Sequence, residues 1–380
     1  MSYFKFMILT SLFVSTQAFY GSQILPFITS SDYTLSDLTE IGILQAVAKF
    51  FEKVRVPWKP TEPPPGSLSG ISDITARKLY DKYYGDDVSS HKFQMVMDQI
   101  IRHNLKVDET YGDQAHWHFN AEKIREGNEK LKELRNNTLS ILTSSSPDYD
   151  AARILIGQFL HIVQDFYSNT NWIDMTGGAA IYEDLGIPGK TLQGIAGPNV
   201  DTCTNCGLLM PCALFGALIK TNLLTSGYRN GQGNATKPQK DPVTNTQGKC
   251  SHGGVFDTTW NTSAATGGIN KETNTLEYSP LFGDHNKAAL LAIEHTRQFF
   301  INSGYGLLNE VGQDKFMKLL ELYPGNPVAF VIDTSSMDML DGVKKFVQDV
   351  IANVTGSVIT PTNYILVTVD TSELQYFLCF

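Results

Sequence analysis

The stretch Gly157–Trp172, GQFLHIVQDFYSNTNW, decides the fold because it has the pattern of a helix that is buried on nearly all sides. Apolar residues cover most of its circumference. The polar residues recur three or four positions apart and therefore share one narrow stripe: Gln158, His161, Asp165 and Ser168. A polar stripe on a buried helix has to be satisfied inside the protein, by water, by hydrogen bonds or by a metal ion.

Two interpretations of this stripe stay open at the level of the residues. His161 and Asp165 are one helical turn apart and present a nitrogen and an oxygen towards a common point, as the ligands of a bound Zn²⁺ do. The same two side chains can also satisfy each other as a hydrogen-bonded pair. Further histidines lie near the ends of predicted helices, but a single histidine on an apolar face is usually a satisfied core residue.

Length and composition indicate a globular protein with two or three domains. The chain has 380 residues, and 42% of them are hydrophobic, which excludes wholesale disorder. The net charge is -9, and no basic run is present that would follow a phosphate backbone. We therefore expect no nucleic-acid partner.

The first residues predict a secreted protein. Lys5 precedes the apolar run Phe6–Val14, and the small residues Thr16 and Ala18 follow at the positions that signal peptidase reads, so residues 1–18 form a predicted signal peptide. The alternative, a membrane anchor, needs a run of about 20 apolar residues. No segment reaches that length, and we expect an extracellular glycoprotein without a transmembrane segment. The predicted glycosylation sites are Asn136, Asn234, Asn261 and Asn353.

The cysteines agree with an oxidising compartment. Four of them fall in one irregular region and predict two disulfides with three possible pairings: Cys203, Cys206, Cys212 and Cys250. The motif CTNC could also indicate a zinc knuckle or a redox pair, but it lacks a second CxxC and a thioredoxin-like context. We expect Cys250 to connect the long loop at about 203–283 back to the Cys203 region.

Helical periodicity predicts a mainly α domain over residues 19–322. The predicted helices are Leu35–Val54, Ile74–Tyr83, His91–His103, Ala121–Leu142, Tyr149–Tyr167, Leu208–Leu224 and Asn286–Phe300. Between residues 226 and 283 the composition changes to Gly, Asn, Thr and Lys, which predicts a long loop.

The composition changes again in the last segment, residues 327–380. PVAFVID and NYILVTVD predict two strands, and MLDGVKKFVQDVIANV between them predicts an amphipathic helix, which together make a β-α-β unit. Such a short segment is too small for a complete doubly wound domain. We expect an incomplete α/β domain here.

Four motifs together resemble the von Willebrand factor A domain-containing protein 7 family: HFNAE at 118–122, LHIVQDFYSNTNW at 160–172, LTSGY at 224–228 and GKCSHGG at 248–254. The resemblance covers about residues 34–368. The N-terminal part of that family is similar to the fungal Het-C protein and, more distantly, to zinc-dependent phospholipase C. The resemblance thus implies a phospholipase C/Het-C-like helical domain, followed here by a truncated factor A domain.

The resemblance also implies metal ligands in the patterns THxDIT, HFD and LHTLQDFYSHSNW. In this chain Leu35, Asn120 and Asn169 occupy three of those positions, and none of them is a good zinc ligand. The remaining candidate ligands are His118, His161 and Asp165, with His252 and His285 as later contributors. A trinuclear hydrolytic cluster needs bridging carboxylates, so the implied cluster is incomplete.

The factor A segment gives a similar result. Members of the family open a Mg²⁺-dependent adhesion site directly after the first strand, and the matching residues here are Asp333, Ser335 and Ser336 in VIDTSSM. The spacing is one residue shorter than the family pattern, and Met337 cannot ligate. We expect a degenerate site without bound Mg²⁺ or Ca²⁺.

The leading hypothesis is a secreted, non-catalytic protein with an interaction or adhesion role towards an unknown extracellular protein ligand. No cofactor is assigned outright, and Zn²⁺ is the candidate for the helical domain. The alternative is a zinc-dependent hydrolase of phosphoesters or phospholipids. In that case His118, His161 and Asp165 hold the metal, and its bound water is the nucleophile.

Overall fold

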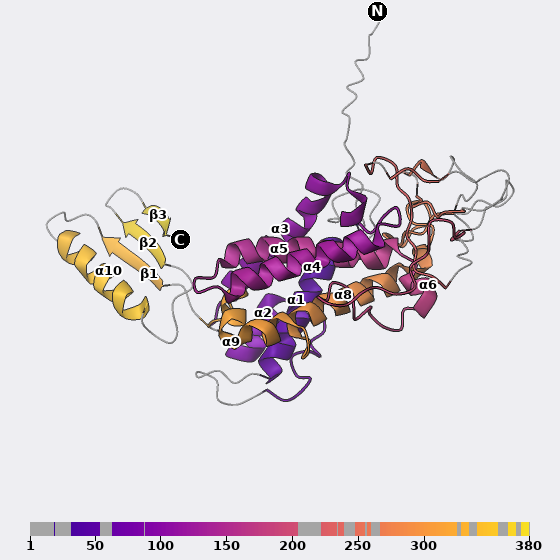
Figure 1. Cartoon of the computed structure of the whole chain (residues 1–380). Helices are drawn as coiled ribbons and strands as arrows, with labels where there is room; N and C mark the ends of the chain where they lie inside the picture. Colours follow the sequence, from indigo (N-terminus) through magenta and orange to yellow (C-terminus); the bar gives the residue numbers. More distant parts are fainter. Residues whose placement is uncertain are drawn as a thin grey trace, which may run out of the picture.

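The computed structural model of the chain describes residues 19, 32–53, 63–86, 88–203, 222–233, 235–238, 248–254, 257–259, 267–324, 328–333, 340–355, 364–369 and 374–379. Over these residues the fold is mainly helical, as predicted (Figure 1). Within the same ranges, no helix is long and apolar enough to cross a membrane. Several predictions fall outside the described residues: the signal peptide, most of the helix Leu208–Leu224, Cys206, Cys212, Asn234, Asn261, Ser335 and Ser336.

The helical part has eight labelled α-helices among the described residues. They are α1 Leu35–Lys53, α2 Ala76–Tyr84, α3 His91–Tyr111, α4 Ile124–Thr143, α5 Tyr149–Asn169, α6 Trp172–Thr176, α8 His285–Ile301 and α9 Leu307–Leu319. Two short 3₁₀ turns, η1 Ala115–Trp117 and η3 Phe282–Asp284, precede the His118 turn and α8. Five of the predicted helices correspond to α1, α2, α3, α5 and α8, and a sixth to α4 with a later start.

Helix α5 is the centre of this part, with α3, α4 and α8 packed against it. Asp148 caps its N-terminus by accepting a 2.9 Å hydrogen bond from the Ala151 amide. Every residue from Phe159 to Asn169 is buried, so the predicted core helix is confirmed. On the polar stripe His161, Asp165 and Ser168 are buried and Gln158 is half-buried.

The helices differ from the predictions mainly at two boundaries and in one helix that was not predicted. Helix α3 continues eight residues past His103 to Tyr111. Helix α4 begins at Ile124 because Ala121 and Glu122 take left-handed backbone angles, with φ of 53° and 58°. Helix α9 was not predicted, since Gly312 at φ 78° interrupts its periodicity.

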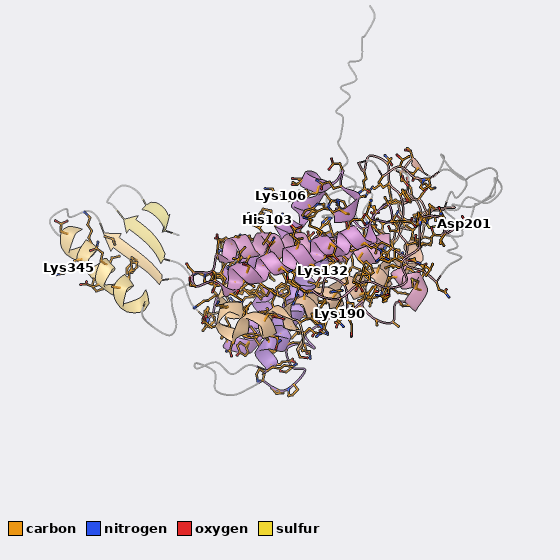
Figure 2. The ribbon with its side chains drawn as sticks, viewed as in Figure 1. His103, Lys106, Lys132, Lys190, Asp201 and Lys345 are labelled. Atoms are coloured by element: carbon orange, nitrogen blue, oxygen red, sulfur yellow. A yellow bond between two sulfur atoms is a disulfide. The ribbon has the colours of Figure 1, made fainter. Side chains whose placement is uncertain are left out.

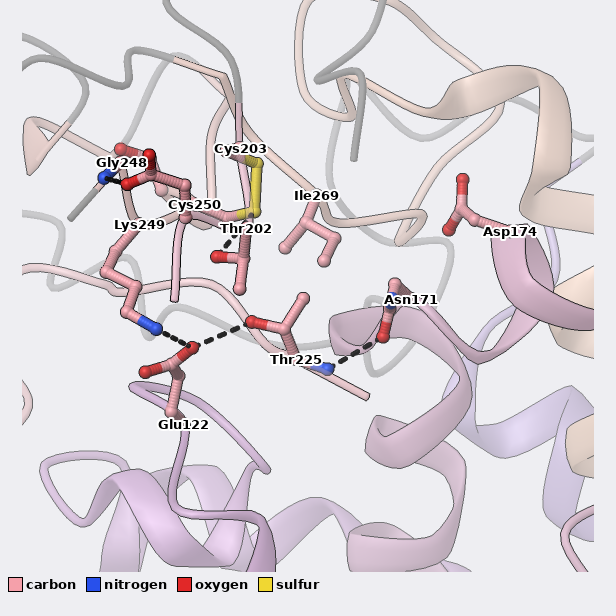
Figure 3. Close-up of a disulfide and its surroundings, with 12 residues drawn as sticks. Glu122, Asn171, Asp174, Thr202, Cys203, Thr225, Gly248, Lys249, Cys250 and Ile269 are labelled. Carbon is pink, nitrogen blue, oxygen red and sulfur yellow. Dashed lines mark hydrogen bonds and ion pairs between the residues drawn. A yellow bond between two sulfur atoms is a disulfide. The ribbon is translucent and has the colours of Figure 1, made fainter. Parts of the chain in front are cut away.

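The described residues of the long irregular region, which we call the cap, lie beside the C-terminal end of α5, where the Thr225 amide donates to Asn171 Oδ1 at 2.8 Å (Figure 3). The disulfide Cys203–Cys250 is present, which confirms that Cys250 connects this region back to Cys203. Lys249 is fully buried beside it, and its Nζ donates to Glu122 Oε1 at 2.9 Å and to the Gly197 carbonyl at 2.8 Å. The ion pair between Lys249 and Glu122 therefore fastens the cap to the turn that follows His118, and the disulfide joins two parts of the cap to each other.

The C-terminal unit contains a sheet of order β1-β2-β3 with one helix (Figure 1). Strands β1 Val328–Asp333 and β2 Tyr364–Val369 run parallel, and α10 Leu340–Thr355 connects them, as the predicted β-α-β unit requires. A third strand, β3 Leu374–Cys379, pairs antiparallel with β2. Only two strands were predicted for this unit from the sequence, and that prediction is wrong because β3 is a third strand of the sheet.

Glycine 157 allows α5 to lie directly against α3. A Cβ built at this position would meet the Ile100 carbonyl oxygen at 2.6 Å and the Asn104 amide nitrogen at 2.8 Å. Gly157→Ala should therefore lower the free energy of unfolding of the helical part by about 1 to 3 kcal/mol in urea denaturation. The matched change Gly342→Ala, where nothing lies within 4 Å, should leave that transition unchanged. Equal effects would contradict this packing.

Candidate metal centre

Two imidazoles and two carboxylates from three segments meet beside the middle of α5. His161 and Asp165 come from α5, Asp108 from α3, and His118 from the turn after η1. His118 Nδ1 lies 2.8 Å from Asp165 Oδ2 and 3.2 Å from His161 Nε2, and His161 Nε2 lies 3.2 Å from Asp165 Oδ2. Asp108 Oδ1 lies 4.0 Å and 3.9 Å from the two ring nitrogens. We call these four residues the His/Asp cluster.

The cluster lies in the protein interior. Asp108 is 5% exposed, His118 1%, and both His161 and Asp165 0%. On α3, Lys106 is exposed on the outer face (Figure 2), whereas Asn104 and Asp108 face inwards and are buried. The structure thus brings together the predicted residues His118, His161 and Asp165, and it adds Asp108.

The outer nitrogen of each histidine faces a hydrogen-bond acceptor, which directs the inner nitrogen at the cluster. His118 Nε2 donates to the Tyr111 carbonyl at 3.2 Å. His161 Nδ1 donates to Asn104 Oδ1 at 3.3 Å. Ligating histidines in metal sites are oriented in this way by a carbonyl or carboxylate behind the ring.

The amide of Asn104 is held in the orientation that this requires. Its Nδ2 donates to Thr39 Oγ1 at 3.0 Å and to Gln164 Oε1 at 2.9 Å, so its oxygen is the atom left for His161. Gln164 also donates to Thr39 Oγ1 at 3.0 Å. This network connects α1, α3 and α5 and fixes the direction of the His161 ring.

The cluster contains acceptors that no donor among the described residues satisfies. Within that part of the chain, both oxygens of Asp108 and Oδ1 of Asp165 have no hydrogen-bond partner, although they are buried. Buried polar atoms without partners are rare in folded proteins and call for a physical cause, such as an ion. The edges of a tetrahedron around Zn²⁺ with bonds near 2.0–2.1 Å are about 3.3 Å long. Asp108, His118 and His161 each offer a ligand atom within 4.8 Å of the other two, so these three residues could hold one divalent ion, and Asp165 lies beside both histidines.

The electrostatics also favour a positive charge at this point. Burial acts to lower the pKa of His161, but the carboxylates of Asp165 and Asp108 outweigh it and raise the pKa to about 9. Burial raises the pKa of Asp108 to about 6. For Asp165, burial acts in the raising direction, and the two histidines outweigh it and lower the pKa. Bound protons or a cation must therefore compensate the negative charge of the carboxylates that face inwards.

The other two predicted histidines are not part of the cluster. His285 is satisfied on both sides, since its Nε2 accepts from the Tyr33 amide at 3.0 Å and its Nδ1 donates to the Lys271 carbonyl at 2.8 Å. His252 Nε2 lies 2.7 Å from Glu272 Oε1. Neither belongs to the metal-capable group found among the described residues, which is Asp108, His118 and His161.

The positions where the family pattern has ligands have other roles or none in this chain. Leu35 is a fully buried apolar residue of α1. Asn169 Nδ2 donates to the His118 carbonyl at 3.0 Å, so Asn169 fixes the backbone of a cluster residue. Asn120 is fully buried, and no described residue hydrogen-bonds to its side chain. Asp333 is at the end of β1 in the C-terminal unit.

Sequence analysis missed Asp108, although a signal for it exists. Asn104 and Asp108 are four residues apart in NLKVDET, the same spacing as His161 and Asp165. They lie beyond His103, where the predicted helix ended. Extending that helix would have placed a second polar pair on a helix face.

These features define a helical domain built around a buried His/Asp cluster and followed by a small α/β unit. The chain belongs to the von Willebrand factor A domain-containing protein 7 family, because the family model described as the VWA7 N-terminal domain matches residues 74–317. This confirms the family that the sequence motifs resemble.

Three curated relatives cover most of the chain, and all are von Willebrand factor A domain-containing protein 7. The rat protein is 29% identical over 372 residues, the mouse protein 30% over 371 and the human protein 30% over 372. Each alignment covers 95% of this chain, and the chain spans 38% of the length of these relatives. No solved structure matches the chain.

Asp108→Asn should have opposite effects with and without metal. In the metal-free protein at pH 7.5 the change removes a buried charge without hydrogen bonds, so unfolding should cost about 1 to 3 kcal/mol more. With zinc present, the loss of a ligand should weaken zinc binding by about tenfold or more. Urea denaturation without zinc measures the change in the free energy of unfolding, and the additional stability with zinc measures the change in zinc binding. Glu109→Gln, at the exposed neighbouring position on α3, is the control and should change neither value.

Zinc binding to the cluster should depend on pH. Because the pKa of His161 is raised to about 9, this imidazole carries a proton at neutral pH, and the metal has to displace it. The apparent zinc affinity should then rise by about tenfold per pH unit from pH 7 to 8.5. Competition against a chelator of known pH dependence measures this slope. A flat profile would contradict the proton-loaded cluster.

Proposed function

We propose that the helical domain binds one divalent ion, Zn²⁺, through Asp108, His118, His161 and Asp165, and that this ion has a structural role. The observation that supports this most directly is the enclosure of all four side chains, none of which is more than 5% exposed. Structural zinc sites have four protein ligands and are closed, whereas catalytic sites keep one position open to water and substrate. We therefore propose that the protein catalyses no reaction and acts by binding an extracellular protein.

The surroundings of the cluster support a structural role. His118 lies in a turn whose left-handed residues are held by the cap, because the Ala121 amide donates to the Gly227 carbonyl at 2.7 Å and the Glu122 amide to Ser226 Oγ at 2.8 Å. A metal bound to His118 would connect this turn to α3 and α5. The ion would thus fasten the disulfide-containing cap to the helical core.

Secretion is part of the same proposal. Asn136 is exposed on α4, as a glycosylation site must be, and the disulfide Cys203–Cys250 requires an oxidising compartment to persist. Phe19, the first residue after the predicted cleavage point, is fully buried, with its ring centroid 5.6 Å from that of His285. A chain that starts at Phe19 would place its first side chain in the core.

For the C-terminal unit we propose the beginning of a von Willebrand factor A domain, the domain after which the relatives are named. The parallel pairing of β1 and β2 around α10 supports this, and Asp333 lies at the carboxyl end of β1. An adhesion-type interaction with an extracellular protein would then require the factor A domain in addition to the helical domain. The similarity of the helical domain to Het-C and phospholipase C is likewise proposed.

A second candidate, a zinc-dependent hydrolase of phosphoesters, is favoured by one observation. Among the described residues, the Asn120 side chain, Asp165 Oδ1 and both Asp108 oxygens are buried without hydrogen-bond partners, which leaves more possible ligand atoms than a single closed ion uses. A hydrolase would use that capacity for a second metal or for the attacking water. The enclosure of the cluster argues against entry of a lipid or another bulky ester.

Metal analysis separates the two candidates. The purified secreted protein should hold one zinc per chain, and its removal by a chelator should lower the melting temperature by about 5 °C or more, as expected when zinc exceeds its Kd by a hundredfold. His161→Ala should remove both the zinc and the shift, and the exposed His91→Ala should keep both. Phosphodiesterase activity should be absent at all zinc concentrations.

Two outcomes would contradict this account. A wild-type protein that contains no zinc, and whose melting temperature does not respond to added zinc, removes the metal site. Zinc-dependent hydrolysis of a phosphodiester that is lost in His161→Ala would show the hydrolase instead. Equal zinc content in His161→Ala and the wild type would place the ion elsewhere.

A further inference from the structure

A surface cavity lies where the turn before His118, the start of α4 and the cap meet. Its volume is about 370 Å³, which is within the range of about 300–1,000 Å³ that is usual for ligand pockets. The lining consists of residues 113–116, of Lys123 and Glu126, and of the cap residues 232, 233 and 235. None of the four residues of the His/Asp cluster lines it, so this cavity is separate from the candidate metal centre.

Asp113 gives the cavity a negative charge that no neighbour compensates. Its side chain is exposed, and no described residue forms a hydrogen bond or an ion pair with its carboxylate. Lys123 and Glu126 compensate each other, since Lys123 Nζ lies 3.0 Å from Glu126 Oε1. The carboxylates and the ammonium group of the lining therefore leave one negative charge, on a protein whose net charge is -9. Both charges attract a cationic ligand.

Gln232 adds an unused hydrogen-bond acceptor to the lining. This side chain is only 3% exposed, and its Oε1 has no hydrogen-bond partner among the described residues. Its Nε2 donates to the Gly112 carbonyl at 3.4 Å, which is longer than an ordinary hydrogen bond. A buried amide oxygen without a donor is costly. Because only this long bond holds the amide, a small rotation can bring its oxygen to a donor in the cavity.

An apolar wall separates the two acceptors from the core of the cap. Ala115 and Ala235 line the cavity and belong to a small hydrophobic cluster that also contains Ala121 and Tyr228. Long cationic side chains lay their methylene groups along apolar surfaces of this kind and keep the charged end at polar groups. The lining thus offers contacts for an apolar stem and for a hydrogen-bond donor at its end.

We propose that this cavity receives a lysine side chain of an extracellular partner protein. The inference deepens the proposed interaction role and rests on it. An ammonium group has three donors and no acceptor, and it ends a flexible four-carbon stem, so it matches a lining of two free acceptors and an apolar wall. An acidic side chain would be repelled by the Asp113 carboxylate. An apolar side chain would leave Gln232 Oε1 without a donor.

Titration of the secreted protein with Nα-acetyl-lysine amide, followed by saturation-transfer NMR, tests the proposal. Nα-acetyl-norleucine amide keeps the stem without the ammonium group and is the control ligand. Asp113→Asn removes the charge at an exposed position, and Gln232→Met removes the amide at similar size. Asp341→Asn is the matched control, because this aspartate is fully exposed in the C-terminal unit. Each titration is repeated after removal of N-glycans, since the predicted glycosylation site Asn234 lies between two lining residues in the sequence.

We expect the wild type to bind the lysine amide about tenfold or more tightly than the norleucine amide, and Asp113→Asn and Gln232→Met each to weaken this binding by about three- to tenfold. Asp341→Asn should equal the wild type. No binding by the wild type with or without glycans, equal binding of the two amides, or unchanged binding by Asp113→Asn would overturn the inference.

The same samples separate this inference from the proposed function. Zinc content is measured on each of them, and lysine binding by a protein without zinc would keep the inference while the metal site fails. An extracellular protein that binds the wild type and Asp113→Asn equally would keep the interaction role and overturn the inference.

Discussion

The structure depends on the meeting of two imidazole nitrogens with two carboxylates in a part of the protein that water does not reach. His118 Nδ1, His161 Nε2 and Asp165 Oδ2 lie within 3.2 Å of one another, and Asp108 faces them with two unpaired oxygens. Without a positive charge between them this arrangement is unstable, because acceptors face acceptors at low dielectric. Protons can supply part of the charge, and a divalent ion supplies it completely.

Residues of several helices orient the two histidines of the cluster. The Asn104 network with Thr39 and Gln164 fixes the ring of His161, and the Tyr111 carbonyl and Asn169 fix His118. The Lys249–Glu122 pair holds the cap against the turn that carries His118, and the disulfide closes the cap itself. If the charge that compensates the cluster is lost, the packing of α3, α5 and the cap should therefore be disturbed at the same time.

The sequence predicted the parts of this arrangement that are local. The buried helix Gly157–Trp172 and the shared direction of His161 and Asp165 follow from periodicity, and His118 follows from the motif HFNAE. Asp108 was not placed, because the predicted helix ends at His103 whereas α3 continues to Tyr111. His285 was a plausible ligand by type, but its partners Tyr33 and Lys271 are distant in the sequence. Strand β3 depends in the same way on its partner β2.

X-ray absorption at the zinc edge of the purified wild-type protein tests the central claim most directly, since it reports the atoms around the metal. The account predicts a first shell of four nitrogen and oxygen atoms at about 2.0–2.1 Å, with the outer-shell scattering of two imidazoles. A shell that contains sulfur, a shell of six oxygens without imidazole, or a protein that cannot be loaded with zinc would contradict it.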